Sequence, residues 1–321
     1  MLAYVIRRSA YGVVTVLGVL LLLFVLFFFV TTPDDMARRA LGEKARPDAI
    51  AQWIENHGYD RPRFWNPEAP RDTMLVEHYR RMLTFDFGKS DADDVSIIRR
   101  LREGAGPSLA LTVPLFLLSL PIALSLALLV AFFRETYVDR LGVVLCVLAM
   151  SVSILLYIVG GQYLIGKVLR WFPISGFDRD PAVIVRFLAL PILIGLARSL
   201  GSEIRFYRTV FVEEVNRDHV RTARAKGCGE GRVMTRHVLR NALIPVLTQV
   251  VLEIPFLFVG SLLLESFFGI PGLGALTVEA IQGNDFATLR TMVFIGALLF
   301  IAGQIATDVG YTLVDPRVRL E

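Results

Sequence analysis

The sequence predicts an all-α integral membrane protein with six transmembrane helices, and three observations support this fold class. The chain is 54% hydrophobic and only 20% charged, with a mean hydropathy of +0.56. Its charges are concentrated, because residues 31–104 hold 27 of the 64 Asp, Glu, Lys and Arg residues. Stretches such as 9–33 and 104–133 hold none. About 20 consecutive apolar residues match the hydrocarbon thickness of a bilayer, whereas a soluble helix needs a polar face. An ordinary water-soluble globule, a disordered chain and a disulfide-rich secreted scaffold are therefore excluded.

The first predicted span covers 11–30 and follows the basic pair Arg7 and Arg8. A signal peptide also begins with positive charge before an apolar stretch. This stretch is longer than the apolar region of a signal peptide, and the TTPDD sequence after it lacks the small-x-small cleavage pattern. The sequence therefore favours a retained N-terminal transmembrane helix within residues 1–30.

Five further spans are predicted at about 106–133, 141–166, 182–202, 241–265 and 290–313. Prolines at 114, 121, 191, 245 and 255 lie inside them. Neighbouring helices can satisfy the carbonyl groups that a proline frees in a membrane, so these prolines predict kinks rather than ends. Arg186 and Arg198 interrupt the span at 182–202, and an arginine at depth must snorkel or face protein.

Six spans place both termini on one side of the membrane. The segments on that side carry 15 Lys and Arg residues, whereas the short loops at 167–181 and 266–289 carry three. The positive-inside rule then predicts cytoplasmic termini and makes residues 31–104 an extracytoplasmic insert. The same rule explains the net charge of +4. A nucleic-acid partner is not expected, because the basic segment 203–240 mixes nine basic with five acidic residues.

The sequence shows no catalytic, metal or cofactor site of its own. Gly88, Lys89 and Ser90 resemble the end of a P-loop, but Leu83 stands where the first glycine is required. The glycine-rich stretch 227–231 is followed by arginine and preceded by no strand, so it predicts a turn rather than a dinucleotide loop. The histidines at 57 and 78 have no cysteine nearby, and cysteines 146 and 228 are not expected to pair.

The connection 203–240 carries the most information about function. Residues 213–226 predict one helix, acidic at its start and basic at its end, which suits the helix dipole. Val220, Ala223 and Ala225 predict a small, flat surface, and Gly227 can adopt the left-handed conformation that ends a helix. A second helix over 230–240 leads into the fifth span. Two interpretations remain open on these residues alone: a helix that transmits motion from a cytoplasmic partner, or an interfacial amphipathic helix.

Residues 218–227 (DHVRTARAKG), followed by 236–245 (RHVLRNALIP), closely resemble the EAA coupling loop of ABC-importer permeases. The version is that of the dipeptide, oligopeptide and nickel branch. The general pattern has Glu-Ala-Ala, then a glycine four residues on. Here the triplet is Arg-Thr-Ala, so only Ala223 and Gly227 agree. That departure is usual in the peptide branch, but it weakens any contact assigned to Arg221.

Other stretches resemble the same branch in the same order. They are YVIRR at 4–8, FDFGKS at 85–90, WFPISG at 171–176, LESFFGIPGLG at 264–274 and DPRVR at 315–319. The resemblance covers nearly the whole chain and implies the type I ABC-importer (MetI-like) permease fold. It divides the chain into helix 1–30, insert 31–104, core 105–315 with coupling loop 203–240, and tail 316–321. YTLVDPR at 311–317 resembles the Yej-type permeases of microcin C-like peptides.

The resemblance implies half of a pathway for a peptide-class solute, in a bacterial inner membrane with both termini cytoplasmic. Its implied partners are a second homologous permease, two cytoplasmic ATPases that hold ATP and Mg, an extracytoplasmic substrate-binding protein and the lipid bilayer. A bulky or charged replacement of Ala223 is expected to uncouple ATP hydrolysis from uptake. The implied ATPase contacts are His219, Val220, Arg221, Thr222, Ala223, Arg224, Ala225, Lys226 and Gly227.

The candidate pathway or outer-gate residues are Glu253, Glu265, Pro271, Gly272, Leu273 and Gly274. Glu253 could pair with a peptide amino group or serve as a structural carboxylate. Asp308 is expected to pair with an arginine at the cytoplasmic end. The aromatic residues of the insert predict either a packed cap or a docking surface.

The alternative functions are a secondary solute transporter, a structural membrane anchor, or an ABC permease for nickel chelates or other small solutes. A secondary carrier would show inverted repeats and would transport without ATPases.

Overall fold

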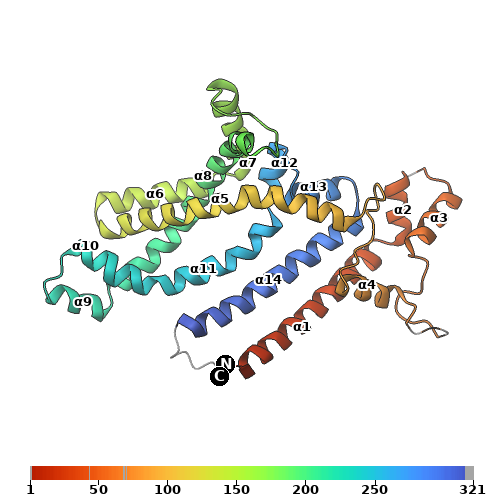
Figure 1. The fold of residues 1–321 in the computed structure, drawn as a ribbon, viewed down its shortest axis with the longest axis horizontal. Helices are drawn as coiled ribbons and strands as arrows, with labels where there is room; N and C mark the ends of the chain where they lie inside the picture. The colour runs from red at the N-terminus through yellow and green to blue at the C-terminus, as the bar shows by residue number, and fades with distance from the viewer. Residues whose placement is uncertain (1, 43, 68, 70, 315–321) are drawn as a thin grey trace.

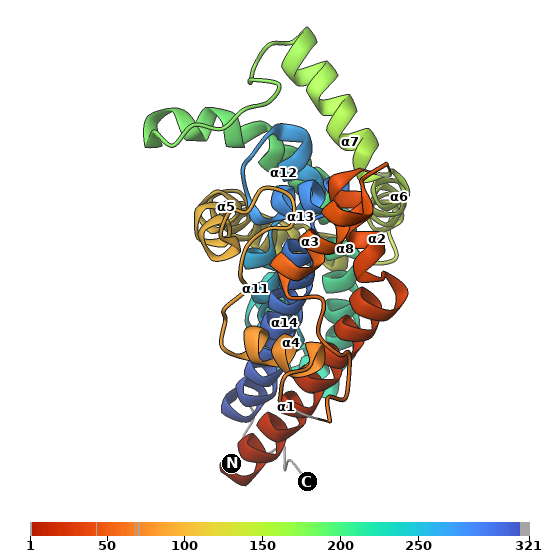
Figure 2. The ribbon, with the colours of Figure 1, turned by 90° about the vertical axis from the view of Figure 1, so that its right-hand side faces the viewer.

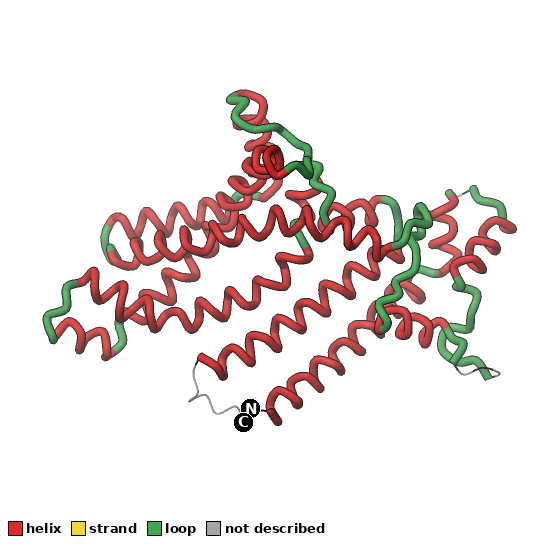
Figure 3. Tube along the Cα trace, in the orientation of Figure 1, coloured by secondary structure: helices red, strands yellow, loops and turns green. Residues whose placement is uncertain are grey.

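The computed structural model describes residues 2–42, 44–67, 69 and 71–314. Helices joined by loops make up this part of the chain (Figure 3). Its β pairing is the single bridge between Lys89 and Ser96. The predicted tail 316–321 and the motif at 315–319 lie outside the described residues.

Five long apolar helical segments are able to cross a membrane, or six when one bent pair counts as a single span. The predicted all-α membrane fold is therefore confirmed. The long helices are α1 (Leu2–Val25) with the π-helical turn η1 (Leu26–Val30), α5 (Ile97–Phe132), α8 (Pro181–Val215), α11 (Leu239–Val259) and α14 (Phe286–Val314). The predicted internal prolines lie within α5, α8 and α11.

The third predicted span is not one straight helix. The pair α6 (Tyr137–Ser151) and α7 (Ile154–Gly161), which continues into η2 (Gln162–Val168), is bent by 87°. The hydroxyl of Ser153 accepts a hydrogen bond from the N–H of Leu155 at 3.3 Å and so caps a new helix. The predicted span at 141–166 is therefore one crossing only when the bent pair is counted as a single span. Figures 1 and 2 show α7 turning away from α6.

Two helix boundaries differ from those that the sequence predicted. Helix α8 continues to Val215, well beyond the expected end near 202, and α5 begins at Ile97, inside the expected insert. The fifth predicted span is interrupted at Gly260, whose φ is +79°. Two short helices follow this break, α12 (Leu262–Phe268) and α13 (Leu273–Gln282).

The long helices run along the long axis of the molecule and separate two functional ends (Figure 1). One, the coupling end, holds α9 (Asp218–Ala225), α10 (Glu230–Arg232) and η3 (Val233–Val238). The other, the insert end, holds α2 (Pro33–Leu41), α3 (Pro47–His57) and α4 (Met74–Leu83).

The start of α1 meets the end of α14 on the same side as α9. Arg8 Nε donates to the Asp308 carboxylate there, which confirms the expected arginine partner of Asp308. Helix α5 packs against α8, and α14 packs against both α1 and α11.

The insert shares its core with the first and last spans instead of forming a separate unit. Apolar residues of α2, α3 and α4 pack against α1, η1 and α14. Trp53 is 8% exposed in this core, whereas Phe64 is 48% and Trp65 is 72% exposed. Trp53 therefore fits the interpretation of a packed cap, whereas a docking surface on the exposed aromatic residues stays a prediction.

Local sequence explains why α2 begins directly after the first span. Thr32 Oγ1 accepts from the N–H of Asp35 at 3.2 Å, and the Asp35 carboxylate accepts from the N–H of Thr32 at 3.2 Å. This reciprocal capping box satisfies the donors at a helix N-terminus. The TTPDD sequence is therefore a helix start.

Candidate functional site

The coupling segment contains a break that the sequence did not predict. Helix α8 ends at Val215 and α9 begins at Asp218, after Arg217 in an extended conformation. Asn216 Oδ1, in the break, accepts from Arg134 Nη1 at 3.1 Å. The prediction of one helix over 213–226 is therefore wrong. Gly227 has a φ of +77°, so its predicted left-handed conformation is confirmed.

Helix α9 presents two different faces. Val220 has no exposed surface and Ala223 is 5% exposed, because both belong to a buried cluster with residues of α8, η3 and α11. These two residues face their own chain in this conformation, and their predicted contact with an ATPase stays a prediction. The outward face is formed by Arg221, Thr222, Ala225, Lys226 and Gly227.

Polar contacts tie α9 to the helices before and after it. His219 Nε2 lies 3.2 Å from Glu214 Oε1 on α8 and 2.9 Å from Asn241 Nδ2 on α11. Arg224 donates twice to the Glu230 carboxylate, at 2.7 and 3.1 Å, across the turn at Gly227. Bidentate guanidinium–carboxylate pairs are geometrically restrictive. Among these contacts, those of His219 reach both α8 and α11.

At the insert end, a buried carboxylate holds the segment after the Gly260 break. Glu265 has no exposed surface. Its Oε1 accepts from the N–H of Ser261 at 2.9 Å, and its Oε2 accepts from the N–H groups of Gly274 at 2.7 Å and Ala275 at 3.1 Å. Gly274 and Ala275 are in the first turn of α13, where free N–H groups and the helix dipole favour a negative charge.

Ser108 of α5 completes this arrangement. Its hydroxyl accepts from the N–H of Leu273 at 2.7 Å and lies beside the Glu265 carboxylate. A Cβ at Gly260 or at Gly272 would lie 2.2 Å from a Glu265 carboxylate oxygen. The close approach of backbone to carboxylate therefore requires glycine at both positions.

The predicted gate residues thus divide into buried and exposed ones. Pro271 is exposed, whereas Gly272, Leu273 and Gly274 are buried beside Glu265. Because Glu265 has no exposed surface, it cannot contact a solute in this conformation. It is a positioning residue for the 271–274 segment, and a gate role for that segment stays a prediction.

A second polar group lies between the long helices. Glu253 Oε1 on α11 accepts from Gln249 Nε2 at 2.9 Å. Glu203 on α8 lies near Ser199 and Ser119, and it lies close enough to Glu253 for their charges to interact. The sequence prediction missed Glu203 because it ended the fourth span near 202.

The signal that would have found Glu203 is the spacing of the apolar residues beyond it. Tyr207, Phe211 and Val215 recur every four residues, and each is at most 1% exposed. This spacing indicates one buried helix face that continues the fourth span.

The motif at 85–90 joins the insert to α14. Asp285, directly before α14, accepts from Ser90 Oγ at 2.6 Å and from the N–H of Asp91 at 3.1 Å. Asp91 Oδ2 accepts in return from the N–H of Ala287 at 2.8 Å. Gly88 makes this turn with a φ of +71°. These contacts give the GKS sequence a structural role.

Two neighbouring side chains of α4 have strongly shifted pKa values. Hydrogen bonds from Arg80 and Arg81 lower the pKa of Glu77 to about 2. Burial, with the charge of Arg290 nearby, lowers the pKa of His78 to about 3. The Nε2–H of the neutral His78 ring donates to the Leu20 carbonyl at 3.1 Å.

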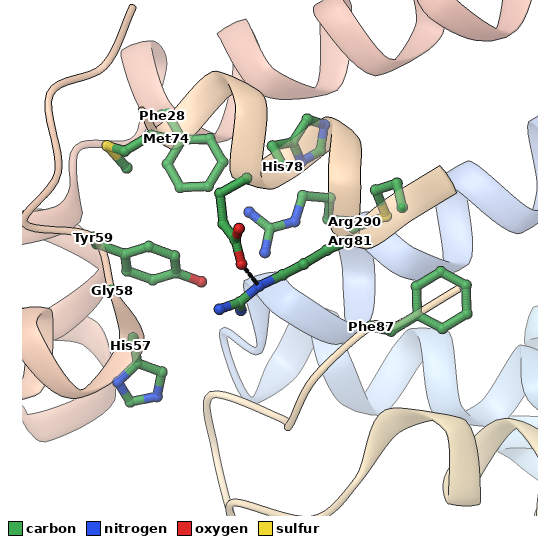
Figure 4. Close-up of a pocket in the computed structure, with 11 residues that line it drawn as sticks. Phe28, His57, Gly58, Tyr59, Met74, His78, Arg81, Phe87 and Arg290 are labelled. Atoms are coloured by element: carbon green, nitrogen blue, oxygen red, sulfur yellow. Dashed lines mark hydrogen bonds and ion pairs between the residues drawn. The ribbon is translucent and has the colours of Figure 1, made fainter. Parts of the chain in front are cut away.

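His57 and His78 line one pocket, together with Tyr59, Arg81 and Arg290 (Figure 4). Within the described ranges, no group of three or more His, Cys, Asp or Glu side chains is placed to hold a metal ion. The permanently charged basic groups that line this pocket are Arg81 and Arg290.

A bundle of membrane-spanning helices, a charged insert at one end and a short helix tied between two spans at the other define a membrane subunit of a transporter. The chain belongs to the family of binding-protein-dependent transport system inner membrane components. Residues 108–320 match the model of that component, and residues 1–66 match the model of its N-terminal part. The predicted resemblance to ABC-importer permeases is thereby confirmed, and the family is one of transport components rather than enzymes.

Two relatives are similar along their entire lengths. A putative peptide transport system permease protein of Brucella abortus is 30% identical over 325 residues, covering 100% of both chains. The glutathione transport system permease protein of Salmonella typhimurium is 31% identical over 322 residues, covering 99% of both. The Yej-type subgroup stays a prediction.

Proposed function

We propose that the chain is the permease subunit of an ATP-driven importer and forms half of a pathway for a peptide-class solute. The other half would be a second homologous permease, with two ATPases at the coupling end and a substrate-binding protein at the insert end. Family membership and the names of the two relatives, which concern peptides and glutathione, support this function. ATP and Mg would be held by the ATPases.

The orientation follows from charge. The coupling end carries most of the basic residues outside the insert, which supports a cytoplasmic position for α9 and both termini. The insert then lies on the extracytoplasmic side, where the binding protein would deliver the solute.

The observation that carries the proposal is the attachment of α9. Its inner face, with Val220 and Ala223, is buried in a cluster that includes residues of α8, η3 and α11, and its outer face is free for an ATPase groove. Closure of the ATPases on ATP would move α9, and the His219 contacts would pass this movement to both spans. ATP binding supplies the difference in free energy that alternating access requires.

A substitution at Ala223 does not test the proposed contact between α9 and an ATPase. Because it is buried against its own chain, a bulky replacement would disturb the packing of α9 itself. Arg221 and Ala225 on the outward face are the better positions, since changes there leave the packing intact.

We assign separate roles in the pathway to the other polar groups. The 271–274 segment would form an outer gate that Glu265 holds in place. Glu203 and Glu253 would face the pathway and attract the positively charged amino end of a peptide, as intramembrane carboxylates commonly mark solute paths.

Co-purification tests the proposal. A tagged chain extracted gently from its native membrane should bring down a second permease and an ATPase pair. Ala225→Glu should lower the recovery of the ATPases without abolishing it and should retain the second permease, because only the outward face of α9 is changed. An isolated chain that transports without an ATPase would overturn the proposal and favour a secondary carrier.

A further inference from the structure

The insert exposes two adjacent aromatic side chains in the loop between α3 and α4. Phe64 is 48% exposed and Trp65 is 72% exposed. Single apolar residues are common on a protein surface, whereas a contiguous apolar patch indicates contact with a membrane or with another protein. We call Phe64 and Trp65 the aromatic tip of the insert.

The aromatic tip lies against the insert end of the first span. The centre of the Phe64 ring is 5.5 Å from that of Phe24 and 5.2 Å from that of Phe29. Both partners belong to segment 6–30, which is long and apolar enough to cross a membrane. Phe29 is next to last in this segment and is itself exposed. The patch therefore includes the end of a transmembrane helix as well as the tip.

The first span has a buried face and an exposed face. The buried face packs in the core that the insert shares with α14. Residues three, four or eight positions apart lie on the same side of a helix, and the exposed face is apolar along its length. An apolar face of a membrane-crossing helix is covered by hydrocarbon. The exposed face comprises Val14, Leu22, Leu26 and Phe29. It ends at Phe29, where Phe64 continues it.

Backbone and side-chain hydrogen bonds fix the position of the tip beside this span. The N–H of Met74, at the start of α4, donates to the Pro62 carbonyl at 3.0 Å. The hydroxyl of Tyr79 on α4 donates to the Leu17 carbonyl of α1 at 2.8 Å. Figure 1 shows α4 alongside α1. The loop is thus tied to α4, and α4 is tied to the first span.

Arg63 adds a positive charge next to the tip. Its guanidinium carbon lies 5.0 Å from the centre of the Phe29 ring. Arg61 is paired with Asp72 at 3.2 Å, whereas the exposed Arg63 forms no ion pair with a carboxylate of the described residues. An arginine at the end of a span can keep its methylene groups on apolar surface and extend its guanidinium to lipid headgroups.

We propose that the aromatic tip anchors the insert in the lipid headgroup region beside the first span. Trp65 lies at the boundary between hydrocarbon and headgroups, where tryptophan is enriched in membrane proteins. Phe64 joins it to the exposed face of the span, and Arg63 binds a lipid phosphate. Lipid is favoured over a protein partner because the patch continues a face that hydrocarbon covers. The inference goes beyond the proposed function and requires only that the first span crosses the membrane.

The emission of Trp65 tests the anchor. Trp65→Phe leaves the core intact because the side chain is exposed, and the emission lost in this variant is that of Trp65. The assembled transporter is placed in phosphatidylcholine vesicles, with either ordinary acyl chains or chains brominated close to the headgroup. Bromine in the lipid should lower the Trp65 emission at least about twofold, whereas iodide on both sides of the vesicles should change it little.

A tryptophan elsewhere on the insert is the matched control. Ala51 is exposed on α3, which Figure 1 shows at the extreme of the insert end. Ala51→Trp is introduced into the Trp65→Phe protein, and the emission that it adds is measured in the same vesicles. Iodide should quench this emission, and brominated lipid should not.

Quenching of Trp65 by iodide and not by lipid would overturn the inference and leave a water-exposed surface for a binding protein. Quenching by neither would also overturn it, and would place the tip against the second permease. Neither result bears on the recovery of the ATPases, which tests the proposed function separately.

Discussion

Glu265 Oε2 accepts a hydrogen bond from the backbone N–H of Gly274 at 2.7 Å, while Oε1 accepts from the N–H of Ser261 at 2.9 Å. One buried carboxylate thus joins the chain directly after the Gly260 break to the first turn of α13. Side-chain and backbone donors surround the charge, which offsets the cost of burying it. The 271–274 segment therefore depends on Glu265 for its position.

Glu265→Gln should lower the free energy of unfolding by about 2–4 kcal/mol, since its amide group would face backbone donors where the carboxylate accepted. The midpoint of thermal unfolding in detergent measures this. Glu279→Gln, on the exposed side of α13, is the matched control and should leave the midpoint unchanged. Equal midpoints for both variants would contradict the positioning role of Glu265.

Gly272→Ala tests the close packing beside that carboxylate. The added Cβ would lie 2.2 Å from Glu265 Oε2 and 2.5 Å from Ser108 Oγ. The φ of Gly272 is −102°, so the cost is steric, and about 1–3 kcal/mol of destabilisation is expected. Gly106→Ala on α5 has nothing within 4 Å of the new Cβ and should be tolerated. If thermal unfolding cannot tell the two variants apart, the packing argument fails.

His78 should make the stability of the insert end sensitive to acid. Its pKa is about 3 in the folded chain, against an ordinary value of 6.5, because it is buried. Below pH 6.5, His78 in the unfolded chain therefore binds a proton that the buried ring in the folded chain does not bind. The stabilisation is complete above pH 6.5 and is lost toward pH 3, at up to about 1.4 kcal/mol per pH unit.

Unfolding measured at pH 7 and pH 5 should show this loss, and His78→Gln should reduce it. The glutamine amide can still donate to the Leu20 carbonyl but does not titrate. Glu77 does not interfere in this range, because its pKa values of about 2 when folded and 4.5 ordinarily both lie below pH 5. The same pH dependence in both proteins would show that His78 is not the titrating group.

The sequence predicted the membrane fold well, because a charge-free run as long as the bilayer is thick indicates a transmembrane helix. Prolines inside such runs indicate kinks rather than helix ends. It failed at places where side chains compete locally with the helix. The break after Val215 has no glycine or proline, and the bend before Ile154 depends on the cap made by Ser153. Neither feature stands out by residue type.

The candidate sites were likewise predicted only in part. The apolar pair Val220 and Ala223, three residues apart on a polar helix, already indicated one buried face. The environment of Glu265 could not be anticipated, because most of its partners are backbone N–H groups, up to ten residues away in the sequence.

The outward face of α9 tests the central claim most directly. In proteoliposomes that contain the assembled transporter, peptide uptake is measured for each ATP hydrolysed, for Ala225→Glu and for Ala51→Glu, an exposed alanine of α3 at the insert end. We predict that Ala225→Glu lowers this ratio at least tenfold while the chain stays in the membrane, and that Ala51→Glu leaves it unchanged. An unaltered ratio for Ala225→Glu would contradict the claim that ATP moves this chain through α9.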